Sequence, residues 1–148
     1  MLERANRVVT RIGDQHLFAT CCYVVLDPAD GALSWASAGH LAPLRVDASP
    51  DYLRTEVGPP LGVQADARFP ESSGTLGRGE LLVLFPDGLV EDRIRPIKTG
   101  LEQLAAVATA CIGRSPSEAA DLLVAAAEDR SDDLALISAR LGSEATPT

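Results

Sequence analysis

Apolar positions recur with a helical period at the start of the chain and form a nearly continuous run after it. One helix face is marked by the apolar residues Leu2, Ala5, Val8, Val9 and Ile12. This spacing predicts an amphipathic helix over residues 2–12. The β-branched and aromatic run over residues 17–26 predicts a strand buried on both faces.

The following segments predict a series of hairpin-linked strands. Residues 27–31 carry Pro and Gly in turn-favouring places, so residues 32–39 are expected to pair back on the preceding strand. Further strands are predicted over 41–46, 81–85 and 134–141, with at best an edge strand over 63–69. Loops and turns are predicted over 47–60, 74–80 and 91–100.

Two helices are predicted between residues 99 and 129. Thr99 and Glu102 have capping-box spacing and predict a helix that runs to about Cys111. Ser115 and Glu118, with a proline between them, predict a second helix that runs to about residue 129. Consecutive antiparallel strands with helices outside them indicate an α+β layered domain.

Composition and charge narrow the function classes. The 148 residues are 46% hydrophobic and 23% charged, as in ordinary globular domains. The net charge of −8 argues against binding to nucleic acid or to anionic membranes. No apolar run approaches the length of a membrane span. The odd cysteine count, without metal-ligand spacing, predicts reduced thiols and a cytoplasmic location.

Two pairs of residues with carboxylates lie at strand junctions. Asp87-Gly88 follows the strand over 81–85, and Asp132-Asp133 precedes the last strand. If the two strands are neighbours, these carboxylates could come together around a hard cation such as Mg²⁺ or Mn²⁺. Spacing alone favours the alternative, in which Asp-Gly and Asp-Asp are solvated turns.

A second candidate spot is Gly39-His40, where the histidine could be a base, a ligand or a satisfied turn residue. His16 has no partner motif and is interpreted as a surface residue. No serine has the context of a catalytic triad. The sequence also lacks a Walker phosphate loop and zinc-ligand spacing.

Five motifs in order give the chain a family resemblance over residues 2–141. They are FAT…YVVLDPADGALSWASAGHLAPL, PPLGV, GELLVLFPDGLVE, TGLEQL and SDDLALI. Together they resemble the SpoIIE-like serine phosphatases, named for stage II sporulation protein E. These are the bacterial branch of the metal-dependent PPM, or type 2C, protein phosphatases.

The resemblance implies a sandwich of two antiparallel sheets flanked by helices, with activity on phosphoserine or phosphothreonine in proteins. It implies Mn²⁺ or Mg²⁺ as cofactor, a metal-activated water as nucleophile, and a phosphorylated anti-sigma-factor antagonist as partner. The alternative is a degenerate, non-catalytic module of the same fold that binds a partner without turnover.

Matched by position, the resemblance assigns metal ligation to Asp87, Asp132 and Asp133 and site-shaping roles to Gly88, Gly39 and His40. Two departures are visible. Pro86 stands where the family usually has threonine, and the family's first metal-binding Asp-Gly motif, with its early strands, is absent. We therefore expect residues 1–141 to be a phosphatase domain truncated at its N-terminal side, followed by a flexible tail over 142–148. Uncovered sheet edges further predict an oligomer or a piece of a longer protein.

Overall fold

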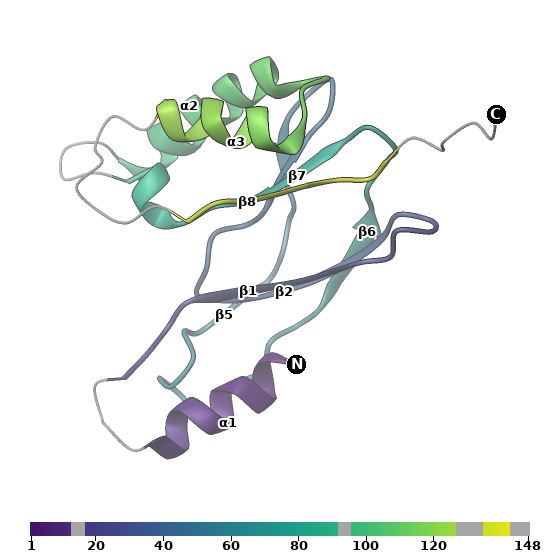
Figure 1. Cartoon of the computed structure of the whole chain (residues 1–148). Helices are drawn as coiled ribbons and strands as arrows, with labels where there is room; N and C mark the ends of the chain where they lie inside the picture. The colour runs from purple at the N-terminus through teal and green to yellow at the C-terminus, as the bar shows by residue number, and fades with distance from the viewer. Residues whose placement is uncertain (13–16, 92–95, 127–134, 143–148) are drawn as a thin grey trace. The chain divides into compact units, whose positions relative to one another are not determined.

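The structure is a computed structural model of the chain and describes residues 1–12, 17–91, 96–126 and 135–142. The chain divides into two compact units (Figure 1). The first unit comprises Met1–Ala42 and Arg54–Thr75, and the second comprises Pro43–Leu53 and Leu76–Thr148. Each unit has its own sheet, and in the described residues the first has one helix whereas the second has two helices and two 3₁₀ turns.

The first unit is built around a β-hairpin. Its elements are α1 (Leu2–Ile12), β1 (Cys21–Leu26), β2 (Ala32–Ala38), β5 (Val57–Gly58) and β6 (Ser72–Thr75). Strands β1 and β2 are antiparallel, with Cys21 opposite Ala38 and Leu26 opposite Leu33. Strand β2 also pairs in parallel with β5 and antiparallel with β6, so it is the central strand of this sheet.

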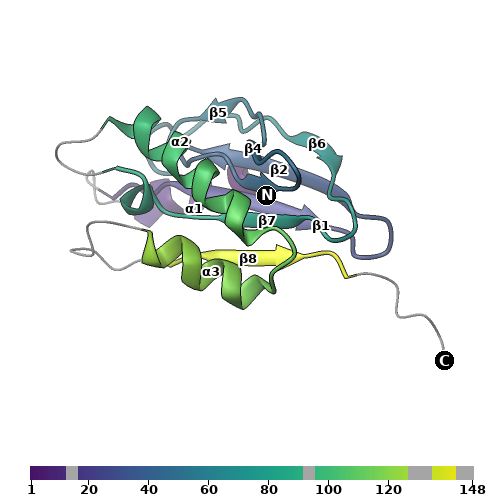
Figure 2. The same cartoon turned by 90° about the horizontal axis from the view of Figure 1, so that it is seen from above.

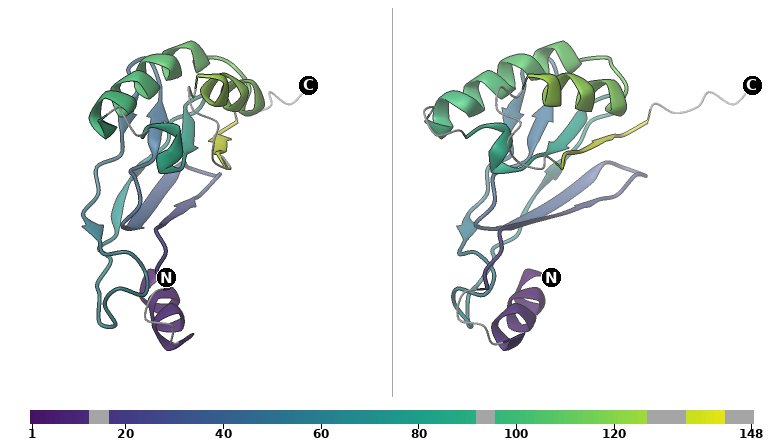
Figure 3. Two further views of the ribbon diagram at one scale, coloured as in Figure 1. Left: turned by 90° about the vertical axis from the view of Figure 1, so that its left-hand side faces the viewer. Right: turned by 60° about the vertical axis from the view of Figure 1, so that its left-hand side comes forward.

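Helix α1 lies on one side of this sheet (Figure 3). It packs there through a small apolar core. Leu2 contacts that core, and the half-buried Ala5 and Val9 pack against it. The prediction that Val8 and Ile12 belong to the same apolar face is wrong, because they are 58% and 64% exposed. The rest of the buried face is supplied by Asn6, a polar residue that the periodicity did not select.

The second unit has an antiparallel sheet with strand order β4-β3-β7-β8. Its strands are β3 (Leu44–Val46), β4 (Asp51–Tyr52), β7 (Leu81–Leu84) and β8 (Ile137–Arg140). Its helical segments are η1 (Asp87–Leu89), α2 (Ile97–Ala108), η2 (Thr109–Cys111) and α3 (Pro116–Ala125), where η marks a 3₁₀ turn. Helices α2 and α3 lie side by side, and α3 contacts β8 (Figure 2).

The α+β class predicted from the sequence is confirmed, as are α1, the β1–β2 hairpin and the strand β7. The strand predicted over 17–26 is wrong in extent and in burial: β1 begins at Cys21, and its residues are half-buried apart from Val25, which is 45% exposed. The reason is that β1 lies at the edge of its sheet. The capping box at the start of α3 is also confirmed. The Ser115 hydroxyl accepts a bond from the Glu118 N–H at 3.3 Å, and the Glu118 carboxylate accepts one from the Ser115 N–H at 2.9 Å. Residues 127–129, the predicted end of this helix, lie outside the described residues.

Other element predictions are wrong in extent or in kind. No strand forms over 63–69, whereas β6 begins in the segment before the predicted turn and β4 and β5 lie inside the predicted 47–60 loop. Helix α2 begins at Ile97 with Pro96 as its N-cap and without a side-chain capping bond. Thr99 therefore lies within the first turn and does not form the predicted box. None of the helices in the described ranges combines the length and apolar character needed to span a bilayer.

Candidate functional site

Asp87 lies at the end of a buried strand, on a tight turn. The first three residues of β7 and the following Phe85 are almost fully shielded from solvent, whereas the Asp87 side chain is exposed. The Asp87 carbonyl accepts bonds from the N–H groups of Val90 and Glu91, each at 2.8 Å. One carboxylate oxygen, Oδ1, accepts the Gly88 N–H at 2.8 Å. Three backbone N–H groups therefore hold Asp87, two at its carbonyl and one at its carboxylate, and the turn presents that carboxylate to solvent.

Pro86 fits the backbone at this position. Its φ of −78° and ψ of 163° are extended, and that φ lies within the range to which the proline ring is confined. Its carbonyl accepts the Leu89 N–H at 3.2 Å. The departure from the usual threonine therefore removes a backbone donor and a hydroxyl without distorting the turn.

The start of α2 is held against this turn by two contacts. Gly100 is buried, and a Cβ atom there would overlap the Val90 carbonyl oxygen and lie 2.6 Å from the Val90 carbonyl carbon. The Tyr52 hydroxyl donates to the Leu101 carbonyl at 2.7 Å, and its ring meets Phe85 edge-on with centroids 6.0 Å apart. Burial raises the pKa of Tyr52, which keeps the hydroxyl a donor. These contacts leave the turn little freedom to move relative to α2.

The Gly39-His40 motif forms a locked turn in the first unit. Gly39 has a φ of +67°, donates its N–H to the Gly58 carbonyl at 2.8 Å, and would place a Cβ atom 2.7 Å from Pro60 Cγ. Glycine is therefore required there for both conformation and space. Below the turn, the buried Ser37 hydroxyl donates to the His40 carbonyl at 2.8 Å and accepts the His40 N–H at 3.1 Å.

The His40 ring is half-buried, and its Nδ1 lies 3.2 Å from the Thr20 hydroxyl. This bond orients the ring through Nδ1 and does not involve the second ring nitrogen, Nε2. The arrangement is suited to a site-shaping residue, and that role stays a prediction. Gly39 and His40 belong to the first unit, whereas Asp87 and Gly88 belong to the second.

The other two predicted ligands, Asp132 and Asp133, lie outside the described residues. Within the described ranges, no group of three or more His, Cys, Asp or Glu side chains is arranged to hold a metal ion. Asp87 is thus the predicted ligand for which the structure gives a geometry. Its exposed carboxylate is a hard oxygen donor of the kind that Mg²⁺ and Mn²⁺ prefer.

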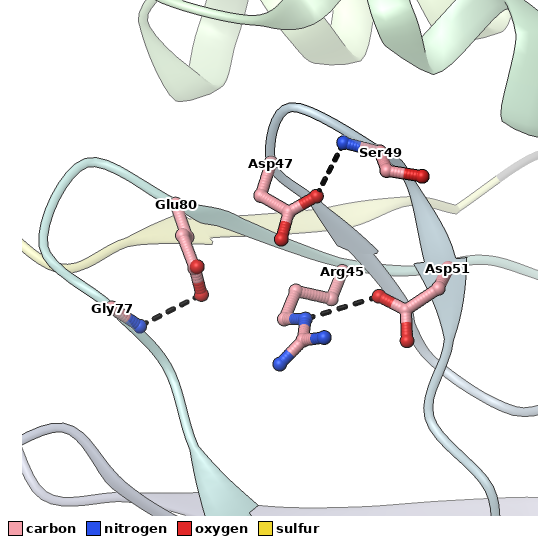
Figure 4. Close-up of polar contacts among 6 residues, drawn as sticks. All are labelled: Arg45, Asp47, Ser49, Asp51, Gly77 and Glu80. Atoms are coloured by element: carbon pink, nitrogen blue, oxygen red, sulfur yellow. Dashed lines mark hydrogen bonds and ion pairs between the residues drawn. The ribbon is translucent and has the colours of Figure 1, made fainter.

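A charged cluster in the second unit escaped the sequence reasoning (Figure 4). Arg45 Nε lies 3.0 Å from Asp51 Oδ1, because the two residues are directly opposed in the β3–β4 register. Burial acts to lower the pKa of Arg45, but Asp51, Glu80 and Asp47 together raise it. Asp47 also accepts the Ser49 N–H at 2.6 Å, and Glu80 accepts the Gly77 N–H at 2.8 Å. Because Asp47 and Glu80 each close a turn and Asp51 pairs with Arg45, we assign this cluster a structural role.

Asn6 was also missed. Its side-chain amide donates to the carbonyls of Gln64 and Ala65 at 2.8 and 3.3 Å, and its Oδ1 accepts the Gly62 N–H at 2.8 Å. One buried side chain therefore ties α1 to the segment that begins with the PPLGV motif. The only sequence signal is a polar residue on the apolar side of the helix, one turn after Leu2.

The comparisons with known proteins agree with this architecture. Residues 1–142 match the family model of stage II sporulation protein E (SpoIIE). Protein IcfG of Synechocystis sp. (strain ATCC 27184 / PCC 6803 / Kazusa) is 30% identical over 87 residues, which are 58% of this chain and 14% of IcfG.

Two solved structures show the same fold. The RsbU and RsbW domains of Rv1364c from Mycobacterium tuberculosis match with a TM-score of 0.77 and 29% identity. That match covers 93% of this chain and 40% of the other. The Mn-presoaked phosphatase domain of Bacillus subtilis SpoIIE matches with a TM-score of 0.69 and 14% identity, over 99% of this chain and 76% of the other.

The chain spans less than half the length of IcfG and of the Rv1364c structure. The family match, in contrast, covers all but its last six residues. The chain therefore belongs to the stage II sporulation protein E (SpoIIE) family.

Proposed function

We propose that this chain acts as a metal-dependent protein serine/threonine phosphatase domain. The observation that carries the proposal is the exposed Asp87 carboxylate, fixed on a tight turn at the end of β7 in a member of the SpoIIE family. The proposed substrate is phosphoserine or phosphothreonine on a regulatory protein of the anti-sigma-factor-antagonist type. The relative with RsbU and RsbW domains supports a regulatory partner of this kind.

Mn²⁺ or Mg²⁺ is the proposed cofactor, held by Asp87 together with Asp132 and Asp133. The Mn-presoaked SpoIIE phosphatase domain supports manganese. Ions of this kind, when bound, lower the pKa of water and neutralise charge on a phosphoryl group. Among the chain's own residues, the Gly88 N–H holds Oδ1 of Asp87 and so fixes the orientation of the carboxylate.

Gly39 and His40 are proposed as site-shaping residues. The bonds from Ser37 fix the backbone of this turn, and the Thr20 hydroxyl orients the imidazole. Supporting bonds of this kind hold a functional side chain in a narrow range of positions, which catalysis requires.

The test is Mn²⁺-dependent hydrolysis of a phosphoserine peptide by the purified chain, with Mn²⁺ binding measured separately by calorimetry. Asp87→Asn should abolish hydrolysis and weaken Mn²⁺ binding, because an amide is a poorer and uncharged ligand. Asp121→Asn, at an exposed position of α3, is the matched control and should behave as the wild type. Equal Mn²⁺ binding by wild type and Asp87→Asn would refute the metal assignment.

A second candidate function is a non-catalytic module of the same fold that binds a partner. Pro86 favours it, because this residue lacks the backbone donor and the hydroxyl of the usual threonine beside the ligand. This candidate predicts a folded chain that neither binds Mn²⁺ more tightly than Asp87→Asn nor hydrolyses the phosphopeptide.

A further inference from the structure

The solvent face of α1 carries a row of arginines. Arg4, Arg7 and Arg11 fall within roughly 60° of arc on an ideal helix, opposite the core residues Leu2 and Val9. All three arginines are exposed. In a chain with 13 basic and 21 acidic residues, this local concentration of positive charge is unusual.

A groove runs along the flank of this helix. It has a volume of about 180 Å³ and is lined by Glu3 and Arg7 of α1 and by residues 65–68. Arg68 lines the groove together with Arg7 and is exposed. No ion pair joins any of these four arginines to another described residue, although Glu3 and Asp66 lie nearby. Their guanidinium groups are therefore free to bind an external acceptor.

Two apolar side chains flank the row. Val8 and Ile12 are one turn apart on α1, and they are 58% and 64% exposed, respectively. A small inorganic anion would use the arginines and leave these side chains in water. A protein segment with acidic and apolar positions would use both, because aliphatic contact adds to the charge pairing.

We infer that this α1 outer surface, made by Arg4, Arg7, Val8, Arg11, Ile12 and Arg68, is a docking site for an acidic amphipathic segment of a partner protein. Charge complementarity selects that occupant. Nucleic acid is disfavoured because the chain carries a net charge of −8 and the surface has no aromatic side chain for stacking. A membrane surface is disfavoured by the same net charge and because α1 lacks Trp, Phe and Leu at its exposed apolar positions.

The test uses a fluorescein-labelled amphipathic peptide, with leucine on one face and glutamate on the other, and measures anisotropy at low and physiological salt. The double variant R4E/R7E should weaken binding at least about tenfold, because two attractive charges become repulsive. The control R54E/K98E makes the same change in net charge at exposed positions elsewhere and should shift the affinity less than about twofold. Circular dichroism confirms that both variants are folded.

If the two double variants weakened binding equally, the overall charge of the protein would explain the effect, and the proposal would be overturned. The absence of peptide binding by the wild type at low salt would also overturn it. V8S/I12S should weaken binding severalfold without changing its salt dependence, and an unchanged affinity would contradict the apolar part of the site. Tighter binding of duplex DNA or of phosphatidylserine vesicles than of the peptide would assign the surface to those ligands instead.

Discussion

Gly100→Ala tests whether α2 fixes the turn that carries Asp87. Within an exposed helix, replacing Gly by Ala stabilises a protein by about 1 kcal/mol. At Gly100 the added Cβ atom would overlap the Val90 carbonyl oxygen and lie 2.6 and 2.9 Å from the Val90 carbonyl carbon and Cα. These are backbone atoms, so no side-chain rotation relieves the contact. We therefore expect Gly100→Ala to destabilise the protein, the reverse of the usual effect of this substitution.

The magnitude follows from the overlap. Carbon atoms in ordinary contact are about 3.5 Å apart, so either α2 or Val90 must move by roughly 1 Å. Overpacking of this kind costs about 1–3 kcal/mol, and the better helix propensity of alanine offsets about 1 kcal/mol of that cost. The free energy of unfolding should therefore fall by about 1 kcal/mol. Because the Val90 N–H donates to the Asp87 carbonyl, a movement of Val90 should also displace Asp87 and its carboxylate.

The assay is urea unfolding of Gly100→Ala beside Ala106→Gly, an exposed position in the same helix that isolates the propensity contribution. Hydrogen exchange at the Val90 and Glu91 amides reports on the turn itself, and both should exchange faster in Gly100→Ala. The reasoning is refuted if Gly100→Ala raises the free energy of unfolding by as much as Ala106→Gly lowers it. Unchanged exchange at both amides would refute the coupling to the turn.

Three further predictions concern stability and thiol reactivity. Asn6→Ala leaves buried donors and acceptors unpaired and should lower the free energy of unfolding by about 1–3 kcal/mol in urea; a cost below that of an exposed alanine substitution would contradict the assignment. Ser115→Ala should cost about 1 kcal/mol at neutral pH. The backbone and side-chain bonds of Ser115 lower the pKa of Glu118, and only the side-chain bond is lost in the variant. In thermal melts the difference should therefore be largest above the ordinary glutamate pKa and shrink as the pH falls through the lowered value, leaving the contribution of the Glu118 N–H bond to the hydroxyl; a difference that does not change with pH would contradict the carboxylate contact. Burial raises the pKa of Cys22 to about 11, so its alkylation by iodoacetamide, followed by mass spectrometry, should be slow at neutral pH and accelerate towards pH 11; rapid neutral labelling would contradict the burial.

Elements with strong local signals could be predicted from the sequence. The period of α1 and the capping box at Ser115 depend on residues within one or two turns, so no distant contact is needed to specify them. The hairpin of β1 and β2 has its register set by the Asp-Pro-containing turn, and β7 is apolar throughout. These predictions hold because local preference and burial agree.

Elements specified by distant partners could not be predicted. Strands β5 and β6 are short and carry serine, glycine and threonine, and they are strands because β2 supplies their hydrogen-bond partners. The inner face of α1 was predicted from apolarity, yet Asn6 is 1% exposed because the 62–65 segment supplies three backbone partners. A polar side chain is buried where its bonds are complete, and sequence spacing does not reveal that completeness.

The candidate site likewise has a part that the sequence predicts and a part that depends on distant contacts. Asp87 was predicted by motif, because a carboxylate after a buried strand is visible in the sequence itself. The contacts that hold its turn, from Gly100 and Tyr52, join segments 13 and 35 positions away in the chain and become visible only in the fold. A reader of the sequence could have noted that Gly100 sits early in a predicted helix, where glycine is costly and therefore needs a reason.

Pro86→Thr separates the two candidate functions, and the structure predicts its outcome. The backbone at residue 86 already suits either residue, and the turn is held by the Asp87 carbonyl bonds and by Gly100 rather than by the residue before it. Loss of the proline should lower the free energy of unfolding by about 0.4–1 kcal/mol, through greater freedom of the unfolded chain. Mn²⁺ affinity measured by calorimetry should stay within about twofold of the wild type. A large gain in Mn²⁺ affinity or the appearance of phosphopeptide hydrolysis in the variant alone would show that the missing donor at Pro86 disables the site, and the chain would then be better described as a partner-binding module.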